Sequence, residues 1–315
     1  GIDKTDRIVV VTDPGSPMEA AAKADGYRIF NADPTVGGRY SALTAFGIVP
    51  SGLAGADIAG LLQDAQEAAK VLATDSVDNP GLILGAALAR TPGEMGFRDK
   101  IGVVADGTPI VGFGDWAEQL IAESTGKQSK GVLPVVLDPK SAELHSGLAD
   151  LLAVHVQADA KPVAGDAVSV SGSLGAQFML WEYATVVASR LIGINPFDQP
   201  DVESAKIAAR GMLEQRDAVI APLFIDSSVE VRATELQISG TAVSDAIKAL
   251  LAQLDDDEGY VSIHAYLDRT SVPEAAQLRD LFANKTRRPV TFGWAPRFLH
   301  STGQYHKGGP RQGVY

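Results

Sequence analysis

The chain has 315 residues, enough for one large or two ordinary domains, and its 45% hydrophobic and 21% charged residues are typical of a soluble globular protein. Its 27 basic and 39 acidic residues give a net charge of −12, which argues against a general nucleic-acid-binding surface. The chain has no cysteine, which excludes disulfides, thiolate metal sites and cysteine nucleophiles and agrees with a cytoplasmic protein. No stretch approaches the roughly 20 consecutive apolar residues of a membrane span.

Strand, turn and helix patterns alternate along the first 200 residues, which predicts an α/β protein with a mainly parallel sheet. The predicted strands cover residues 7–12, 101–105, 132–137, 151–156 and 167–170. The predicted helices cover residues 53–73, 115–124 and 174–191, and three more begin at Pro17, Pro80 and Pro200. Ser16 and Glu19 form a capping box at the start of the first of these helices.

The pattern changes from about residue 217. We expect a half-buried strand at residues 229–233, a helix at 242–254, strands at 260–267 and 290–293, and a glycine-rich tail. A further helix is predicted for residues 271–282, with Ser271 and Glu274 as its capping box. The acidic run at residues 255–258 lacks the ligand spacing and glycine turn of a calcium loop, so it is predicted to be a solvated loop.

Two glycines precede an arginine at residues 37–39. Glycines let the backbone approach a ligand closely, and here they place amide N–H groups beside the guanidinium of Arg39. That arrangement suits an oxyanion or a developing enediolate. The alternative is a tight turn followed by a surface arginine, which these residues alone do not exclude.

Gln119 and Glu123 are four residues apart and therefore share one face of the predicted helix. Glu123 lies in the last turn before Gly126, where the negative end of the helix dipole is expected to raise the pKa of its carboxyl group. A carboxylate with a pKa closer to neutrality suits proton abstraction next to a carbonyl. The alternative is an ordinary amphipathic helix that ends at a glycine.

Two further segments combine turn residues with polar side chains. At residues 193–206 a turn rich in Asn, Pro and Asp leads into a helix start, which attracts anions, with Lys206 about two turns in. At residues 298–309 two histidines, a glutamine and a lysine lie among three glycines. Because no Cys, Asp or Glu accompanies them, acid–base chemistry is favoured over a zinc site.

Together these four segments resemble the signature sequences of the phosphoglucose isomerases, in particular the bacterial type also found fused to transaldolase. The matching stretches read Gly-Gly-Arg-Tyr-Ser-Ala-Leu, Glu-Ser-Thr-Gly-Lys, Asn-Pro-Phe-Asp-Gln-Pro and His-Ser-Thr-Gly-Gln. The resemblance runs from about residue 7 to the end. It implies sugar-isomerase domains of three α/β/α layers, each with a five-stranded parallel sheet, and a cytoplasmic homodimer that interconverts glucose 6-phosphate and fructose 6-phosphate in glycolysis and gluconeogenesis without metal or cofactor.

The resemblance also implies a role for individual residues. Glu123 matches the base that moves a proton between C1 and C2 through a cis-enediol, and Arg39 matches the group that stabilises the enediolate. Lys206 matches the lysine at the ring oxygen, and His300 matches the histidine that assists ring opening. The implied substrate-binding residues are Gly38, Gln119, Gln199 and Gln304.

The order of the segments differs from most family members, in which the histidine segment precedes the Phe-Asp-Gln segment. His300 follows both, whereas His145 lies near the usual chain position but has no glutamine four residues later. We therefore expect His300, with Gln304 four residues on, to be the ring-opening histidine. His145, His155 and His264 are each expected in or beside structural elements.

The family's Ser/Thr-rich phosphate loop, of the Ser-Lys-Ser-Gly-Thr-Thr kind, does not occur in this sequence. We therefore expect a C-terminal fragment that begins inside an incomplete first domain and has little activity alone. The expected parts are the remainder of the first sugar-isomerase domain (1–50), a helical connection (51–98), a second sugar-isomerase domain (99–216) and a C-terminal α/β extension with the catalytic histidine (217–315).

Two other functions fit the same fold class. A non-catalytic sugar-phosphate-binding module would have no need of the base Glu123, so the presence of this residue argues against it. A nucleotide-binding protein is disfavoured because the glycines at residues 112–114 and 172–175 lack the full dinucleotide fingerprint, and no Walker-type loop is present. No nucleophile elbow of a serine hydrolase occurs either.

Overall fold

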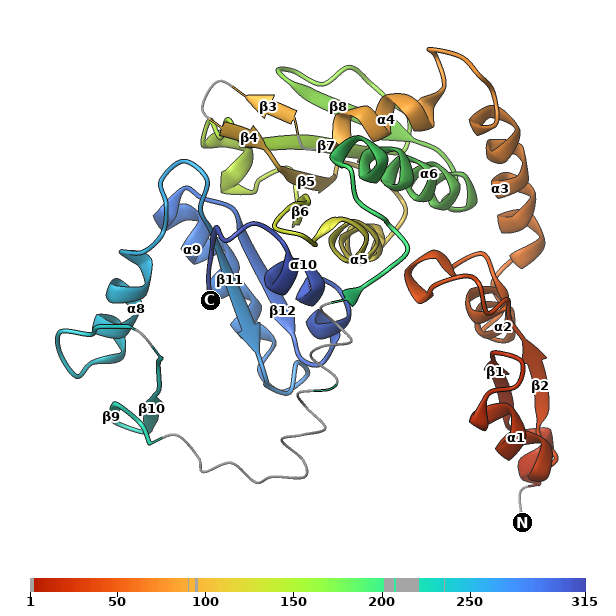
Figure 1. Ribbon diagram of the computed structural model, residues 1–315, viewed down its shortest axis with the longest axis horizontal. Helices are drawn as coiled ribbons and strands as arrows, with labels where there is room; N and C mark the ends of the chain where they lie inside the picture. Colours follow the sequence, from red (N-terminus) through yellow and green to blue (C-terminus); the bar gives the residue numbers. More distant parts are fainter. Residues whose placement is uncertain (1–2, 90, 94–95, 201–206, 208–220, 235) are drawn as a thin grey trace.

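The computed structural model describes residues 3–89, 91–93, 96–200, 207, 221–234 and 236–315. Figure 1 shows three parts in chain order: a small N-terminal unit, a central parallel sheet with its helices, and a C-terminal unit beside that sheet. The predicted α/β class with a parallel sheet flanked by helices is confirmed.

The N-terminal unit pairs two parallel strands, β1 (Val9–Thr12) and β2 (Arg28–Asn31), through helix α1 (Pro17–Ala24). Ser16 caps α1 as predicted, because its hydroxyl oxygen accepts the amide of Glu19 at 3.1 Å. The Glu19 carboxylate accepts the amide of Gly15 at 2.7 Å instead of the Ser16 amide, so the capping box is displaced by one residue. The 3₁₀ turn η2 (Gly38–Tyr40) and helix α2 (Ala45–Leu53) follow.

Three helices pack together beside the central sheet: α3 (Ile58–Leu72), α4 (Pro80–Leu88) and α6 (Leu174–Ile192). Asn79 caps α4, since its side-chain oxygen accepts the amides of the first turn. Its side-chain nitrogen donates to the carbonyls of Leu72 and Thr74, each at 2.9 Å. One buried amide therefore fixes the end of α3 against the start of α4. The short hairpin of β3 (Thr91–Gly93) and β4 (Gly96–Arg98) leads into the central sheet.

The central sheet has the strand order β6-β5-β7-β8, and all three pairings are parallel. Its strands are β5 (Lys100–Ala105), β6 (Leu133–Leu137), β7 (Leu151–Gln157) and β8 (Ala167–Ser171). Continuous apolar runs make β5 and β6 buried along most of their length, as is typical of a sheet with packed faces. The resemblance implies five strands, whereas the described residues give four.

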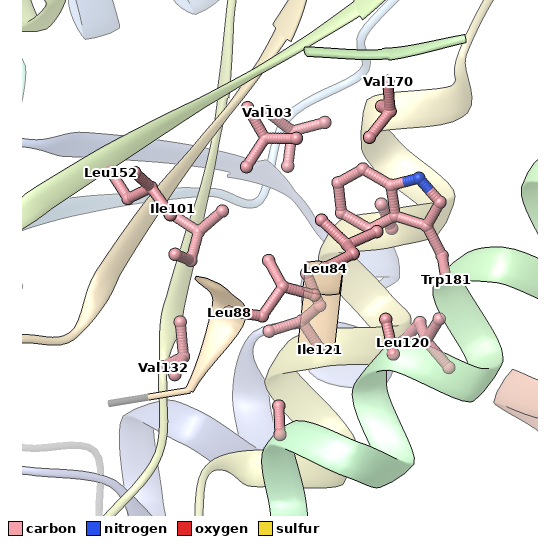
Figure 2. Close-up of a cluster of buried hydrophobic side chains, with 14 of the residues drawn as sticks. Leu84, Leu88, Ile101, Val103, Leu120, Ile121, Val132, Leu152, Val170 and Trp181 are labelled. Atoms are coloured by element: carbon pink, nitrogen blue, oxygen red, sulfur yellow. The ribbon is translucent and has the colours of Figure 1, made fainter. Parts of the chain in front are cut away.

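Helix α5 (Phe113–Thr125) joins β5 to β6 and packs with α4 and α6 on one face of the sheet. Figure 2 shows the side chains of this core, with Leu84, Leu88, Ile101 and Trp181 meeting between the helices and the strands. Each of these four is at most 2% exposed. Burial of such side chains contributes roughly 1.5–3 kcal/mol each, which holds α4 and α6 firmly against the sheet.

The C-terminal unit contains a second parallel sheet of order β12-β11-β13. Its elements are β9 (Phe224–Asp226), β10 (Val229–Val231), α8 (Val243–Leu251), β11 (Tyr260–Ala265), η4 (Pro273–Gln277), α9 (Leu278–Thr286), β12 (Val290–Trp294), η5 (Arg297–His300), α10 (Gly303–Gly308) and β13 (Gly313–Val314). Tyr260 and Tyr305 join the central sheet's Leu133 and Val135 in one buried cluster. The unit is therefore packed onto the central sheet.

Two expectations for this unit were wrong. Ser271 does not cap a helix: its hydroxyl donates to Asp268 at 2.7 Å, and the chain forms η4 and then α9 in place of one helix over residues 271–282. The strand β10 spans only Val229–Val231 and is mostly exposed, not half-buried. The glycine-rich tail contains η5, α10 and β13. The helix expected from Pro200 lies outside the described residues.

Candidate active site

Arg39 is buried at the point where η2, α5 and the turn after α6 meet, and only 5% of it is exposed. Its Nε donates to Ser124 Oγ at 2.9 Å and its Nη1 donates to Gln199 Oε1 at 2.9 Å. Its Nη2 donates to the carbonyls of Pro196 at 2.6 Å and Asp198 at 3.0 Å. A tight turn with a surface arginine, the alternative from the sequence, is therefore excluded.

Glu123 faces the same guanidinium. Its Oε2 lies 3.9 Å from Arg39 Nη1 and accepts a hydrogen bond of 3.4 Å from Gln119 Nε2. Only 6% of Glu123 is exposed. A guanidinium has five N–H groups, and the four bonds above use four of them, so one N–H on Nη1 remains on the Glu123 side. A carboxylate and an N–H donor thus lie side by side, as proton transfer with oxyanion stabilisation requires.

The turn that follows α6 is fixed by Lys127, which is 1% exposed. Its Nζ donates to the carbonyls of Asn195 at 2.7 Å and Asp198 at 2.5 Å and pairs with the Asp198 carboxylate at 2.6 Å. The same turn presents Gln199 to Arg39. The segments Gly-Gly-Arg, Glu-Ser-Thr-Gly-Lys and Asn-Pro-Phe-Asp-Gln, far apart in the chain, therefore meet at one place.

The histidine segment lies against the same helix α5. Gln304 is fully buried, and its Nε2 donates to the carbonyl of Gly126 at 2.9 Å. His300 ends the 3₁₀ turn η5 and is exposed, and its side chain makes no hydrogen bond or ion pair with any described residue. His145 lies elsewhere, in a cavity that it lines with Arg98, Leu148 and His155.

Gly38 begins η2 and is exposed, with open space where a Cβ would stand. Lys206, the fourth residue expected to act in catalysis, lies outside the described residues. The described site residues thus bring together Arg39, Glu123, Gln119 and Gln199. The turn that carries His300 lies against the same helix α5, through Arg297 and Glu118.

Three contributors were not predicted. Ser124 accepts from Arg39 and shares a hydrogen bond of 2.9 Å with the hydroxyl of Tyr40. Lys127 belongs to the Glu-Ser-Thr-Gly-Lys segment, so the motif could have pointed to it. Glu118 is 6% exposed, and burial raises the pKa of its carboxyl group to about 7. Nothing in the local pattern distinguishes Glu118 from a surface glutamate of an amphipathic helix.

In the part of the chain that the structure describes, no group of three His, Asp or Glu side chains is arranged to hold a metal ion. Among the described helices, none has the length and apolar character needed to cross a bilayer.

The curated relatives of this chain are glucose-6-phosphate isomerases. A probable glucose-6-phosphate isomerase from Haloarcula marismortui is 39% identical over 134 residues, which are 42% of this chain and 30% of that protein. The glucose-6-phosphate isomerase of Lactobacillus helveticus is 28% identical over 265 residues, 66% of this chain and 58% of that protein. The chain is thus similar in sequence to glucose-6-phosphate isomerases over up to about two thirds of its length. It spans between 30% and 58% of the length of these two isomerases.

Two solved structures share the fold of this chain. A glucose-6-phosphate isomerase from Chlamydia trachomatis has a TM-score of 0.55 at 17% identity, covering 68% of this chain and 54% of that one. A hypothetical protein from Thermus thermophilus also has a TM-score of 0.55, at 22% identity over 67% of this chain and 64% of that one. No protein-family model matches the chain.

Proposed function

We propose that this chain carries the proton-transfer half of an aldose–ketose isomerase site that interconverts glucose 6-phosphate and fructose 6-phosphate through a cis-enediol. The observation that supports it is the pairing of Glu123 with Arg39: a buried carboxylate whose Oε2 lies 3.9 Å from a guanidinium nitrogen with one N–H to spare. Isomerisation moves a proton between adjacent carbons while negative charge develops on oxygen, so it needs a base and an oxyanion donor.

The proposed roles follow this geometry. Glu123 takes the proton from C2 of the open aldose and returns it to C1, and Gln119 orients its carboxylate through the 3.4 Å hydrogen bond. Arg39 donates its remaining N–H to the developing enediolate. Because Arg39 is held by four hydrogen bonds, it needs no reorganisation as charge develops. His300 assists ring opening and Lys206 contacts the ring oxygen.

Gly38, Gln199 and Gln304 are proposed substrate contacts. Gln199 already accepts from Arg39, so its amide nitrogen is the end that would meet a sugar hydroxyl. The family resemblance further supports a cytoplasmic homodimer that acts in glycolysis and gluconeogenesis. Because the Ser/Thr-rich phosphate loop does not occur in this sequence, we propose that the chain turns over slowly on its own.

Isotope exchange tests the proposal without requiring fast turnover. Fructose 6-phosphate is incubated with the chain in deuterium oxide, and deuterium entering C1 of the ketose or C2 of the aldose is followed by NMR. We expect slow exchange, abolished by Glu123→Gln and retained by Glu67→Gln, which changes an exposed glutamate on α3. No exchange after prolonged incubation would contradict the isomerase, and rapid turnover would contradict the expected weak activity.

A further inference from the structure

The position of His300 raises a physical question. An exposed imidazole with no partner among the described residues must be held by its backbone alone. The 3₁₀ turn η5 that carries it has only four residues, Arg297–His300, and 3₁₀ turns have weak internal hydrogen bonds. Something outside the turn therefore has to fix it.

Glu118 on α5 pairs with the chain just before His300. Its Oε1 accepts a hydrogen bond of 3.2 Å from Arg297 Nη1, three residues before the histidine. The hydroxyl of Ser301, the residue after the histidine, donates to the Phe298 carbonyl at 3.4 Å and lies near enough to Glu118 to favour its carboxylate. Arg297 Nη2 also donates to the carbonyl of Asp115 at 2.8 Å and lies 3.3 Å from the Asp115 carboxylate. All these groups on α5 belong to the helix that bears Glu123.

We infer that Glu118 is a positioning residue, which clamps the segment Arg297–Ser301 to α5 and so sets His300 relative to Glu123. The inference rests on the proposed function, because the distance between Glu123 and His300 matters only if they act as the base and the ring-opening histidine of one reaction. Gln304 fixes the other end of the segment to the last turn of α5. Positioning of this kind matters because small displacements of a reacting group lower rates strongly.

The clamp depends on charge. Burial disfavours the carboxylate of Glu118 and Asp115 adds repulsion, whereas Arg297 and Ser301 favour it, and together they place its pKa at about 7. The closed segment keeps the proton on Glu118 up to about pH 7, whereas a solvent-exposed glutamate loses it near its ordinary pKa, so closure becomes less favourable as pH rises even though the carboxylate attracts Arg297 once it forms. Because 41% of the Arg297 side chain is exposed, the ion pair is partly screened by solvent.

The test compares Glu118→Gln with Asp115→Asn, which removes the outer, 60% exposed partner of the same arginine. Hydrogen–deuterium exchange reports the amides of residues 298–301 at pH 6 and pH 8, corrected for intrinsic exchange. In the unchanged chain we expect protection to be about tenfold lower at pH 8 than at pH 6, because opening the segment lets the Glu118 carboxyl ionise at its ordinary, lower pKa. Glu118→Gln should abolish this pH dependence and Glu118→Ala should lower the protection at both pH values, whereas Asp115→Asn should preserve both the protection and its pH dependence.

Protection that is unchanged in Glu118→Ala, or that still depends on pH in Glu118→Gln, would overturn the clamp. The deuterium-incorporation assay, run on the same samples, separates this failure from failure of the proposed function. A working clamp and a working isomerase give loss of protection together with about tenfold slower exchange into the sugar at saturating substrate. Loss of protection in a chain that never exchanges the sugar proton would support the clamp and contradict the isomerase.

Discussion

The substitution Asp150→Asn is expected to destabilise the chain strongly, because it breaks a buried ionic cluster between the central sheet and the C-terminal unit. Asp150 is 5% exposed and its Oδ2 lies 2.9 Å from Lys100 Nζ and within hydrogen-bonding distance of Arg288. Lys100 is fully buried and Arg288 is 4% exposed. Lys100 would then keep the carboxylate of Asp99 at 2.7 Å, whereas Arg288 would keep the carbonyl of Gly259, to which its Nε donates at 2.8 Å, in place of a carboxylate.

Removing one partner of a buried pair costs about 3–5 kcal/mol, because the remaining charge stays buried without full compensation. At about 2 °C per kcal/mol for a chain of this size, the melting temperature should fall by about 6–10 °C. The matched control is Asp166→Asn, which removes the same carboxylate from a pair with Arg98 in which Asp166 is 85% exposed. That change should cost about 0–1 kcal/mol.

Thermal and urea unfolding followed by circular dichroism measure both variants. A loss of the same small size in the two variants would refute the reasoning that burial decides the contribution. A further check is Lys100→Met, introduced alone and with Asp150→Asn. The second change should cost less in the presence of the first, with a coupling of at least about 1 kcal/mol, since the two side chains act as one unit.

Three other predictions concern single buried groups. Burial lowers the pKa of His306 from 6.5 to about 3, so the unfolded chain binds a proton at this histidine before the folded chain does. The free energy of unfolding should therefore fall by up to about 1.4 kcal/mol per pH unit below pH 6.5. Urea titrations at pH 7 and pH 5 should show a smaller fall in His306→Gln. Burial raises the pKa of Glu182 to about 8, so the folded chain keeps this proton to a higher pH than the unfolded chain does. The free energy of unfolding should therefore fall as pH rises from 4.5 to 8. Glu182→Gln should flatten that decline, and an unchanged slope would contradict the prediction. Gln304→Ala removes the donor to the Gly126 carbonyl and should lower the free energy of unfolding by about 1–3 kcal/mol, with Gln66→Ala on the exposed face of α3 as the control.

The elements that follow from local chemistry were predicted well. Continuous apolar runs located β5, β6 and β7, and Asn79 before Pro80 located the start of α4. These patterns are decided within a few residues, so no knowledge of tertiary contacts is needed. The predicted helix start at Ser271 failed because the Asp268 carboxylate binds the hydroxyl on which the capping box depends.

The partners of the site residues could not be predicted in the same way. The sequence marks Arg39 as a ligand-binding residue, but two of its acceptors are backbone carbonyls 157 and 159 positions away. A carbonyl carries no sequence signature, because every residue has one. Glu118 was missed for a related reason: its partner Arg297 lies 179 residues later in the chain.

Helix α5 explains how such distant segments form one site. Its Glu118 contacts the histidine segment, its Glu123 and Ser124 contact Arg39, and the carbonyl of its C-cap residue Gly126 accepts from Gln304. The helix is itself fixed by a core in which Leu120 and Ile121 are at most 1% exposed. A rigid element with polar groups on two faces and apolar groups on the third can set the distance between a base and an acid that belong to different parts of the chain. A shift of α5 would therefore move all of these groups together, which preserves the relative geometry on which proton transfer depends.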